Sequence, residues 1–348
     1  MPELNQEPLS YTFNHMPDVG KDKWEYGFAT AVVWALETKL LSRNTFVEMI
    51  NSPDFKTAAD CLTGTEYGFA ASAGSFAEIE AGLLESRSDV RKLFSDLIDN
   101  DDYRELFKSS TDFANLRLAI RRLVTEKAIG VDYSDDGNVA AHKFEEVLEQ
   151  ENYAEFPLFL QEAVELAVLK YYDNKDIRQI DYGIDKYSCE YFAEKAASID
   201  DEFLVELFRM MSDLNDIRTL FRLKFRESEQ KDHFCGCGYL DKSRMIHCLE
   251  IGYEGLAAMF SATPYHHIIE AGANYLVKNN SFLKLEQMCN SHLMTYLKST
   301  YRIAAGPQSI VAYMLRKEME IRTVRMILVG KKNSLEPAVL LDGLYTEE

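Results

Sequence analysis

The sequence contains few residues that interrupt helices, with only 8 prolines and 17 glycines in 348 residues. It has no window of about 18 consecutive apolar residues, which a membrane-crossing helix needs. The N-terminus lacks the basic and apolar regions of a signal peptide. It has no Walker-type phosphate loop, dinucleotide-binding glycine motif, His-Glu-x-x-His or Gly-x-Ser-x-Gly. We therefore expect neither a membrane span nor an enzyme built on these motifs.

Basic residues are also scarce relative to acidic ones, 38 against 57, which gives a formal net charge of −19. This balance argues against general nucleic-acid binding, because phosphate contacts require a clustered basic surface. The six cysteines are irregularly spaced and do not resemble a disulfide framework. A reduced, cytoplasmic protein is the simplest interpretation.

Between the few interruptions, apolar residues recur every three or four positions, as in the series Trp24, Phe28, Val32 and Leu36. That period is helical, and no alternating run indicates a strand. Two segments have the spacing of capping boxes, Thr45–Glu48 and Ser75–Glu78. Three others place an N-cap before a proline: Ser52-Pro53, Thr263-Pro264 and Gly306-Pro307. The sequence predicts an all-α protein.

The chain also repeats itself. Residues 105–121 and 206–222 share six identical positions, and residues 314–325 form a weaker third copy. The copies share an acid, a small polar residue three positions later, an aliphatic residue and an arginine: Asp112/Asn115/Leu116/Arg117, Asp213/Asp216/Ile217/Arg218 and Glu320/Thr323/Val324/Arg325. The offsets of about 101 and 107 residues have the size of a small domain. We predict three similar helical domains, at 20–130, 131–230 and 231–335, between tails at 1–19 and 336–348.

The repeat helices are locally basic beside an apolar stripe. Two interpretations remain for their arginines. They pair with acids of their own domain, or they help form a positive concave surface that binds a partner. The candidate partner-binding residues are Arg117, Arg121, Arg218, Arg222, Arg322 and Arg325.

Other candidates for chemistry are weak, and we predict no catalytic residue and no cofactor. His233, Cys235 and Cys237 carry zinc-type ligands, but Cys-x-Cys is not the usual zinc spacing. An incidental cysteine-rich loop between domains is the favoured interpretation. The pair His266 and His267 is interpreted as partly buried or at an interface, with a ligand pair as the alternative.

Several segments together resemble a known family, the C subunits of the bacterial and archaeal V-type (A-type) ATPases, or AC39 family, the counterpart of the eukaryotic d subunit. They include the helix of residues 26–42 and the element Leu62-Thr-Gly-Thr65-Glu-Tyr67-Gly68. The helices around Asn115-Leu-Arg117 and Asp216-Ile-Arg218, and the C-terminal run from Glu320 to Lys331, also match. Thr323 and Asp216 stand where the family usually has Asn.

The resemblance implies three helical domains around a pseudo-threefold axis, in a funnel-like shape. It also implies a non-catalytic component on the cytoplasmic face of the membrane, which couples the central shaft, made of the D and F subunits, to the proteolipid rotor ring. Torque for H⁺ or Na⁺ transport would pass through it, and it would be peripheral to the membrane. The alternatives are a free-standing helical scaffold or regulatory protein with a different partner, and a zinc-dependent protein.

Overall fold

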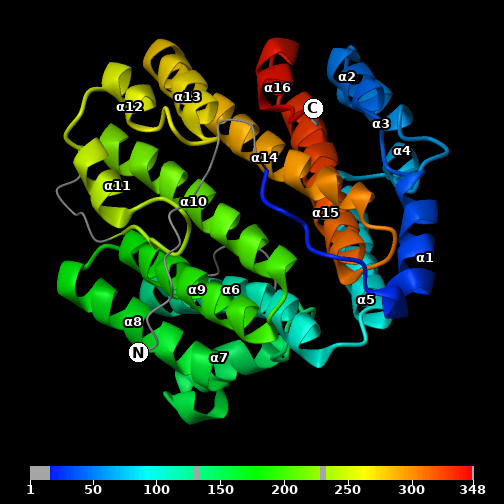
Figure 1. Cartoon of the computed structure of the whole chain (residues 1–348). Coiled ribbons are helices and arrows are strands. Elements are labelled where there is room, and N and C mark those ends of the chain that lie inside the picture. Colours follow the sequence, from blue (N-terminus) through cyan, green and yellow to red (C-terminus); the bar gives the residue numbers. More distant parts are fainter. Residues whose placement is uncertain (1–15, 128–132, 228–232, 347–348) are drawn as a thin grey trace. The chain divides into compact units, whose positions relative to one another are not determined.

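The computed structural model describes residues 16–127, 133–227 and 233–346. These residues form sixteen α-helices and three short 3₁₀ helices, with no strand among them (Figure 1), so the all-α prediction is confirmed. The chain separates into two compact units. Unit 1 comprises the described residues of Met1–Asp99 and Gly252–Glu348, and unit 2 comprises those of Asn100–Ile251.

Unit 1 joins the two ends of the sequence around one long helix, α15 (Pro307–Lys332), which lies beside α5 (Phe76–Leu97). Its core includes Met49, Leu62, Ile79, Val324 and Leu328. The remaining helices are η1 (Trp24–Tyr26), α1 (Gly27–Glu37), α2 (Arg43–Asn51), α3 (Phe55–Asp60), α4 (Phe69–Ser72), α12 (Tyr253–Met259), α13 (His266–Asn279), α14 (Leu283–Lys298), η3 (Ser299–Arg302) and α16 (Pro337–Gly343).

Unit 2 is continuous in sequence. Its long helices are α6 (Asp101–Thr125), α8 (Leu158–Asn174), α9 (Arg178–Ile199) and α10 (Glu202–Phe225). The shorter ones are α7 (Ala141–Glu149), η2 (Tyr153–Glu155) and α11 (Lys242–Cys248). Helix α9 contacts α8, α6 and α10, and the core between these elements includes Leu116, Phe144, Leu160 and Ile184.

The division into three domains stays a prediction. The boundaries at 130/131 and 230/231, and residues 1–15 of the predicted N-terminal tail, lie outside the described residues. The segment predicted as a C-terminal tail contains α16, whose Leu340 is buried in the core of unit 1.

The predicted helix starts are partly confirmed. Ser75 caps α5 by accepting from the Glu78 amide, and Gly306 precedes Pro307 at the first position of α15. The capping box at Thr45 is wrong, because Ser42 caps α2 and accepts from the Thr45 amide. The starts at Pro53 and Pro264 are also wrong. Both prolines lie in turns, and the helices begin two residues later, at Phe55 and His266.

The three repeat sequences fall on the long helices α6, α10 and α15, and their predicted apolar stripes are buried. In α6, Asp112 accepts hydrogen bonds from the backbone amides of Asn138 and Val139, at 2.9 and 3.0 Å. In α10, Asp213 accepts from Tyr239 and Leu240, at 3.1 and 2.9 Å. Both carboxylates are fully buried, and the sequence separations of 26 and 27 residues are identical in the two copies.

The polar residue three positions later holds the same loop. The Asn115 side chain exchanges two hydrogen bonds with the backbone of Ser134, and Asp216 accepts from the Cys235 and Gly236 amides. Asp216 therefore replaces asparagine without losing the loop contact. Burial raises the pKa of Asp216, although these amide donors act in the opposite direction.

A glycine allows each loop to approach its carboxylate. A Cβ atom on Gly137 would lie 2.2 Å from Oδ1 of Asp112, and one on Gly238 would lie 2.0 Å from Oδ1 of Asp213. No other residue fits these positions without moving the loop or the acid. The two glycines stand 25 residues after their acids, so they belong to the repeat.

The third copy takes its loop from the opposite end of the chain. Glu320 accepts from the backbone amide of Leu41, at 2.5 Å across 279 residues. Leu41 directly precedes Ser42, the N-cap of α2, just as Val139 and Leu240 directly precede the N-caps of α7 and α11. Thr323 instead donates to the Met319 carbonyl of its own helix.

We predict that Asp213→Ala destabilises unit 2 by about 2–4 kcal/mol, because it leaves two buried amides without an acceptor. Urea unfolding followed by circular dichroism measures this loss. Hydrogen exchange in residues 233–241 should also accelerate. The matched control is Asp241→Ala, which removes an exposed N-cap and should cost about 1 kcal/mol. Equal losses in the two variants would contradict the anchoring role of Asp213.

Candidate functional site

The predicted arginines of α6 pair with acids of α9. Arg117 bonds to Asp185 and lies 3.6 Å from Asp181, and Arg121 bonds to Asp181. Burial raises the pKa of the Asp185 carboxyl, while Arg117 and Arg222 oppose the rise. Arg222 of α10 thus acts on the same acid as Arg117. Two of the six candidates therefore pair with two aspartates of one helix.

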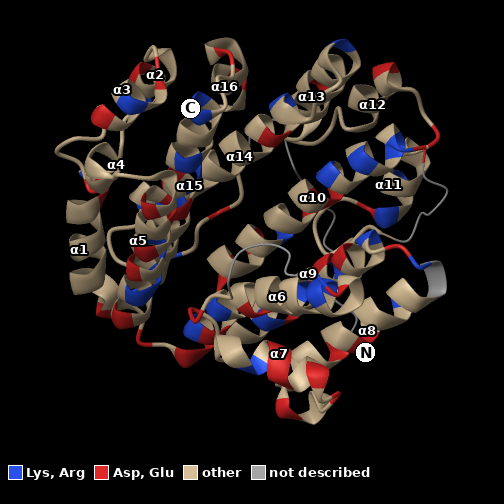
Figure 2. Cartoon of the chain, turned by 180° about the vertical axis from the view of Figure 1, so that it is seen from behind, with Lys and Arg blue, Asp and Glu red and all other residues tan. Residues whose placement is uncertain are grey.

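The arginines of α15 are also paired, as the mixed charge along α5 and α15 suggests (Figure 2). Nε of Arg325 lies 2.8 Å from Glu80 of α5, and Arg322 lies 3.3 Å from Glu318 of its own helix. Glu318 is buried and also contacts Arg91, at 2.7 Å. Burial alone would raise its pKa, but the surrounding arginines hold it below the usual range.

The structure thus supports pairing within each unit, and the role in partner binding stays a prediction. Arg218 is partly buried and Arg222 is exposed, and both interact with neighbouring groups. The side chains of Arg322 and Arg325 remain 64% and 54% exposed despite their acids. A paired but exposed guanidinium keeps donors that can bind a partner.

A buried polar network surrounds the third repeat acid. Tyr67 donates to Oε1 of Glu320 at 2.7 Å, and Nζ of Lys317 lies 2.6 Å from the same oxygen. Lys317 also lies 2.8 Å from Glu66 and 4.6 Å from the centre of the Tyr67 ring. Burial raises the pKa of Tyr67, and the Glu320 carboxylate adds to the rise. Tyr67 and Glu320 thereby join the Leu62–Gly68 element to α15.

The cysteine-rich loop does not form a metal cluster in the part of the chain that the structure describes. The His233 ring stacks on Tyr182, with 4.0 Å between ring centres. A hydrogen bond to Cys189 and burial raise the pKa of Cys235, and burial raises that of Cys237 to about 12. That this loop is not a metal site stays a prediction. Within the described ranges, the residues that do meet are His266, His267 and Glu270.

Two exposed aromatic side chains lie at the start of unit 1, and the apolar period did not reveal their exposure. A helix expected within residues 26–42 is present as α1 over Gly27–Glu37, but its buried residues are Ala29, Thr30 and Val33. Trp24 and Phe28 are 72% and 81% exposed. Thr30 explains the orientation of α1, because its hydroxyl exchanges hydrogen bonds with the backbone of Gly306.

None of the described helices is long and apolar enough to cross a membrane. The sequence model of the ATP synthase (C/AC39) subunit family matches residues 29–342. The chain belongs to this family. It is also similar to the C subunit of the V-type sodium ATPase of Enterococcus hirae, with 20% identity over 316 residues, which cover 89% of this chain and 94% of that protein.

The range of this AC39-family chain that matches the family model runs from α1 to α16. All three repeat helices, their acids and the residues that these acids hold lie inside the matched range. Trp24 and Phe28 precede residue 29 and lie outside it.

Because Phe28 is exposed, we predict that Phe28→Ser changes the free energy of unfolding of unit 1 by less than about 0.5 kcal/mol. Val33→Ser, on the buried side of the same helix, should cost about 2–4 kcal/mol. Both tryptophans lie in unit 1, so their fluorescence during urea unfolding reports on this unit. A loss in Phe28→Ser as large as in Val33→Ser would show that the Phe28 ring is part of the core.

Proposed function

We propose that this protein is a non-catalytic central-rotor component of a V-type ATPase, which couples the central shaft to the membrane rotor ring. The observation that carries the proposal is the family match over nearly the whole chain, together with a relative named as the C subunit of a V-type sodium ATPase. Its partners are the D and F subunits of the shaft and the proteolipid ring. It binds at the cytoplasmic face, peripheral to the membrane, and transmits torque for H⁺ or Na⁺ transport.

The internal construction suits an adaptor under torque. Such a part must keep its shape when one surface is turned against another. Each repeat helix is tied to a loop by a buried carboxylate, and close-packed helices have low compressibility. Because a buried hydrogen-bonded carboxylate is costly to separate from its donors, the ties resist deformation of the loops.

Arginines at equivalent positions of the repeat helices are the proposed contacts to the shaft. Complementary charge at an interface sets its register and disfavours wrong partners. Arg117, Arg218 and Arg325 are the three equivalent residues. The acids paired with Arg117 and Arg325 hold these guanidinium groups in place, so less side-chain entropy is lost when a partner binds.

The first test is co-purification with the cognate D–F heterodimer. The full chain with a non-histidine affinity tag should retain D and F in stoichiometric amounts through size-exclusion chromatography. An unrelated acidic helical protein with the same tag serves as the control. Folded D–F that elutes separately from the folded chain would favour a free-standing scaffold instead.

The second test reverses single charges. We expect about tenfold weaker D–F affinity, or about 1.4 kcal/mol, in each of Arg117→Glu, Arg218→Glu and Arg325→Glu. Each substitution replaces a positive charge with a negative one at the proposed interface. Arg122→Glu is the control, since Arg122 lies on the same helix as Arg117 but outside the repeat positions, and pairs with Glu145 of α7. Isothermal titration gives the dissociation constants. Unchanged affinity in all three folded variants would contradict the proposed contacts.

A further inference from the structure

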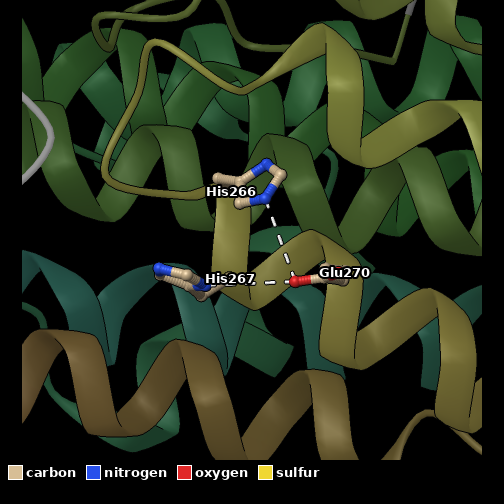
Figure 3. Close-up of side chains that lie close together, drawn as sticks. All are labelled: His266, His267 and Glu270. Atoms are coloured by element: carbon tan, nitrogen blue, oxygen red, sulfur yellow. Dashed lines mark ion pairs between the residues drawn. The ribbon is translucent and has the colours of Figure 1, made fainter.

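Two histidines and a glutamate meet at the N-terminal end of α13 (Figure 3). Nε2 of His266 lies 3.8 Å from Oε2 of Glu270, and Nδ1 of His267 lies 4.0 Å from the same oxygen. All three potential ligand atoms lie within 4.8 Å of one another. This is the one group of three possible metal ligands that converges in residues 16–127, 133–227 and 233–346.

The His266 ring is held in the orientation that metal binding requires. Its Nδ1 lies 2.8 Å from the backbone carbonyl oxygen of Ala257 in α12. A carbonyl only accepts hydrogen bonds, so Nδ1 is the donor and carries the proton. In the neutral imidazole, Nε2 then carries the lone pair, and this nitrogen lies 3.8 Å from Glu270. In protein metal sites, a bound histidine commonly donates its other ring nitrogen to such an acceptor.

The turn before α13 fixes the backbone that carries His266. Thr263 donates to the Phe260 carbonyl at 2.8 Å and accepts from the Tyr265 amide at 3.3 Å. Tyr265, directly before the cluster, is almost completely buried. His266 is thus anchored at both its backbone and its ring. The side chains of His267 and Glu270 are 67% and 53% exposed, so they have room to rotate toward it.

We propose that His266 Nε2, His267 Nδ1 and Glu270 bind a divalent transition-metal cation, with Zn²⁺ the best fit, and that water completes the coordination. Two imidazoles and one carboxylate form a zinc ligand set with an open fourth position. Mg²⁺ and Ca²⁺ fit poorly because they require mainly oxygen ligands. The site is independent of the proposed rotor function.

The geometry needs only a small adjustment. Tetrahedral zinc with bonds of about 2.0–2.2 Å separates its ligand atoms by about 3.3 Å. The present distances of 3.8 and 4.0 Å exceed this value slightly. Rotation of the exposed His267 and Glu270 side chains closes the gap, while His266 stays in place. The bound cation would link the start of α13 to α12 through Ala257.

The site is tested by titrating the purified full chain, without a histidine tag, with Zn²⁺ and with Co²⁺. We expect one cation per chain and a melting temperature that rises with metal concentration. His267→Ala and Glu270→Gln should each weaken binding by about tenfold or more. The Co²⁺ spectrum should show imidazole and carboxylate ligation, without the intense near-ultraviolet band that cysteine thiolates produce.

His247→Ala is the matched control. His247 lies 4.0 Å from Glu250 at the same three-residue spacing, and this pair belongs to no group of three possible ligands in the described part of the chain. This variant should bind Zn²⁺ like the unaltered chain. The proposal is overturned if the unaltered chain binds no Zn²⁺, if thiolate bands dominate, or if the folded His267→Ala and Glu270→Gln variants keep full affinity.

Discussion

Buried carboxylates that accept backbone amides connect the long helices of this protein to the loops before the next short helix. Asp112, Asp213 and Glu320 each hold the residue directly before an N-cap. Placing an ionised group in the interior is unfavourable unless donors surround it, so each acid requires its loop as much as the loop requires the acid. The helix starts, the close approach of Gly137 and Gly238, and the position of the Leu62–Gly68 element all depend on these contacts. In the third copy the longer side chain of Glu320 keeps the contact. The position equivalent to the two glycines, two residues before Leu41, is Lys39, so this copy needs no glycine there.

The same acids connect the fold to the proposed function. An adaptor between a shaft and a ring has no substrate to position. It requires a rigid shape and surface residues that bind its partners. The repeat helices meet both needs with neighbouring residues, because the acid faces inward and the arginine five positions later is still partly exposed in α6 and α15. The acids of α9 and α5 hold these arginines in place, which makes internal pairing compatible with contact to a partner.

Much of the fold follows from spacing alone. Apolar residues such as Leu116, Ile217 and Val324 recur with the helical period and are buried as this period predicts. The partners of the repeat acids were not predicted, because a hydrogen bond across 279 residues leaves no local pattern. The glycines 25 residues after Asp112 and Asp213 were the available signal. The exposure of Trp24 and Phe28 escaped prediction for a related reason, since the tertiary contact of Thr30 with Gly306, and not the apolar period, decides which face of α1 is buried. At His266, sequence showed two adjacent histidines, but only the fold brings the Ala257 carbonyl to the ring.

The bond between Leu41 and Glu320 also imposes an order on synthesis. Unit 2 is one continuous segment, and all its described hydrogen-bond partners emerge from the ribosome in succession. The first helices of unit 1 are made before unit 2, yet the acid that holds their loop is made only after unit 2. The nascent N-terminal segment must therefore stay incomplete while about 280 further residues are added, so unit 1 closes after unit 2 has been made.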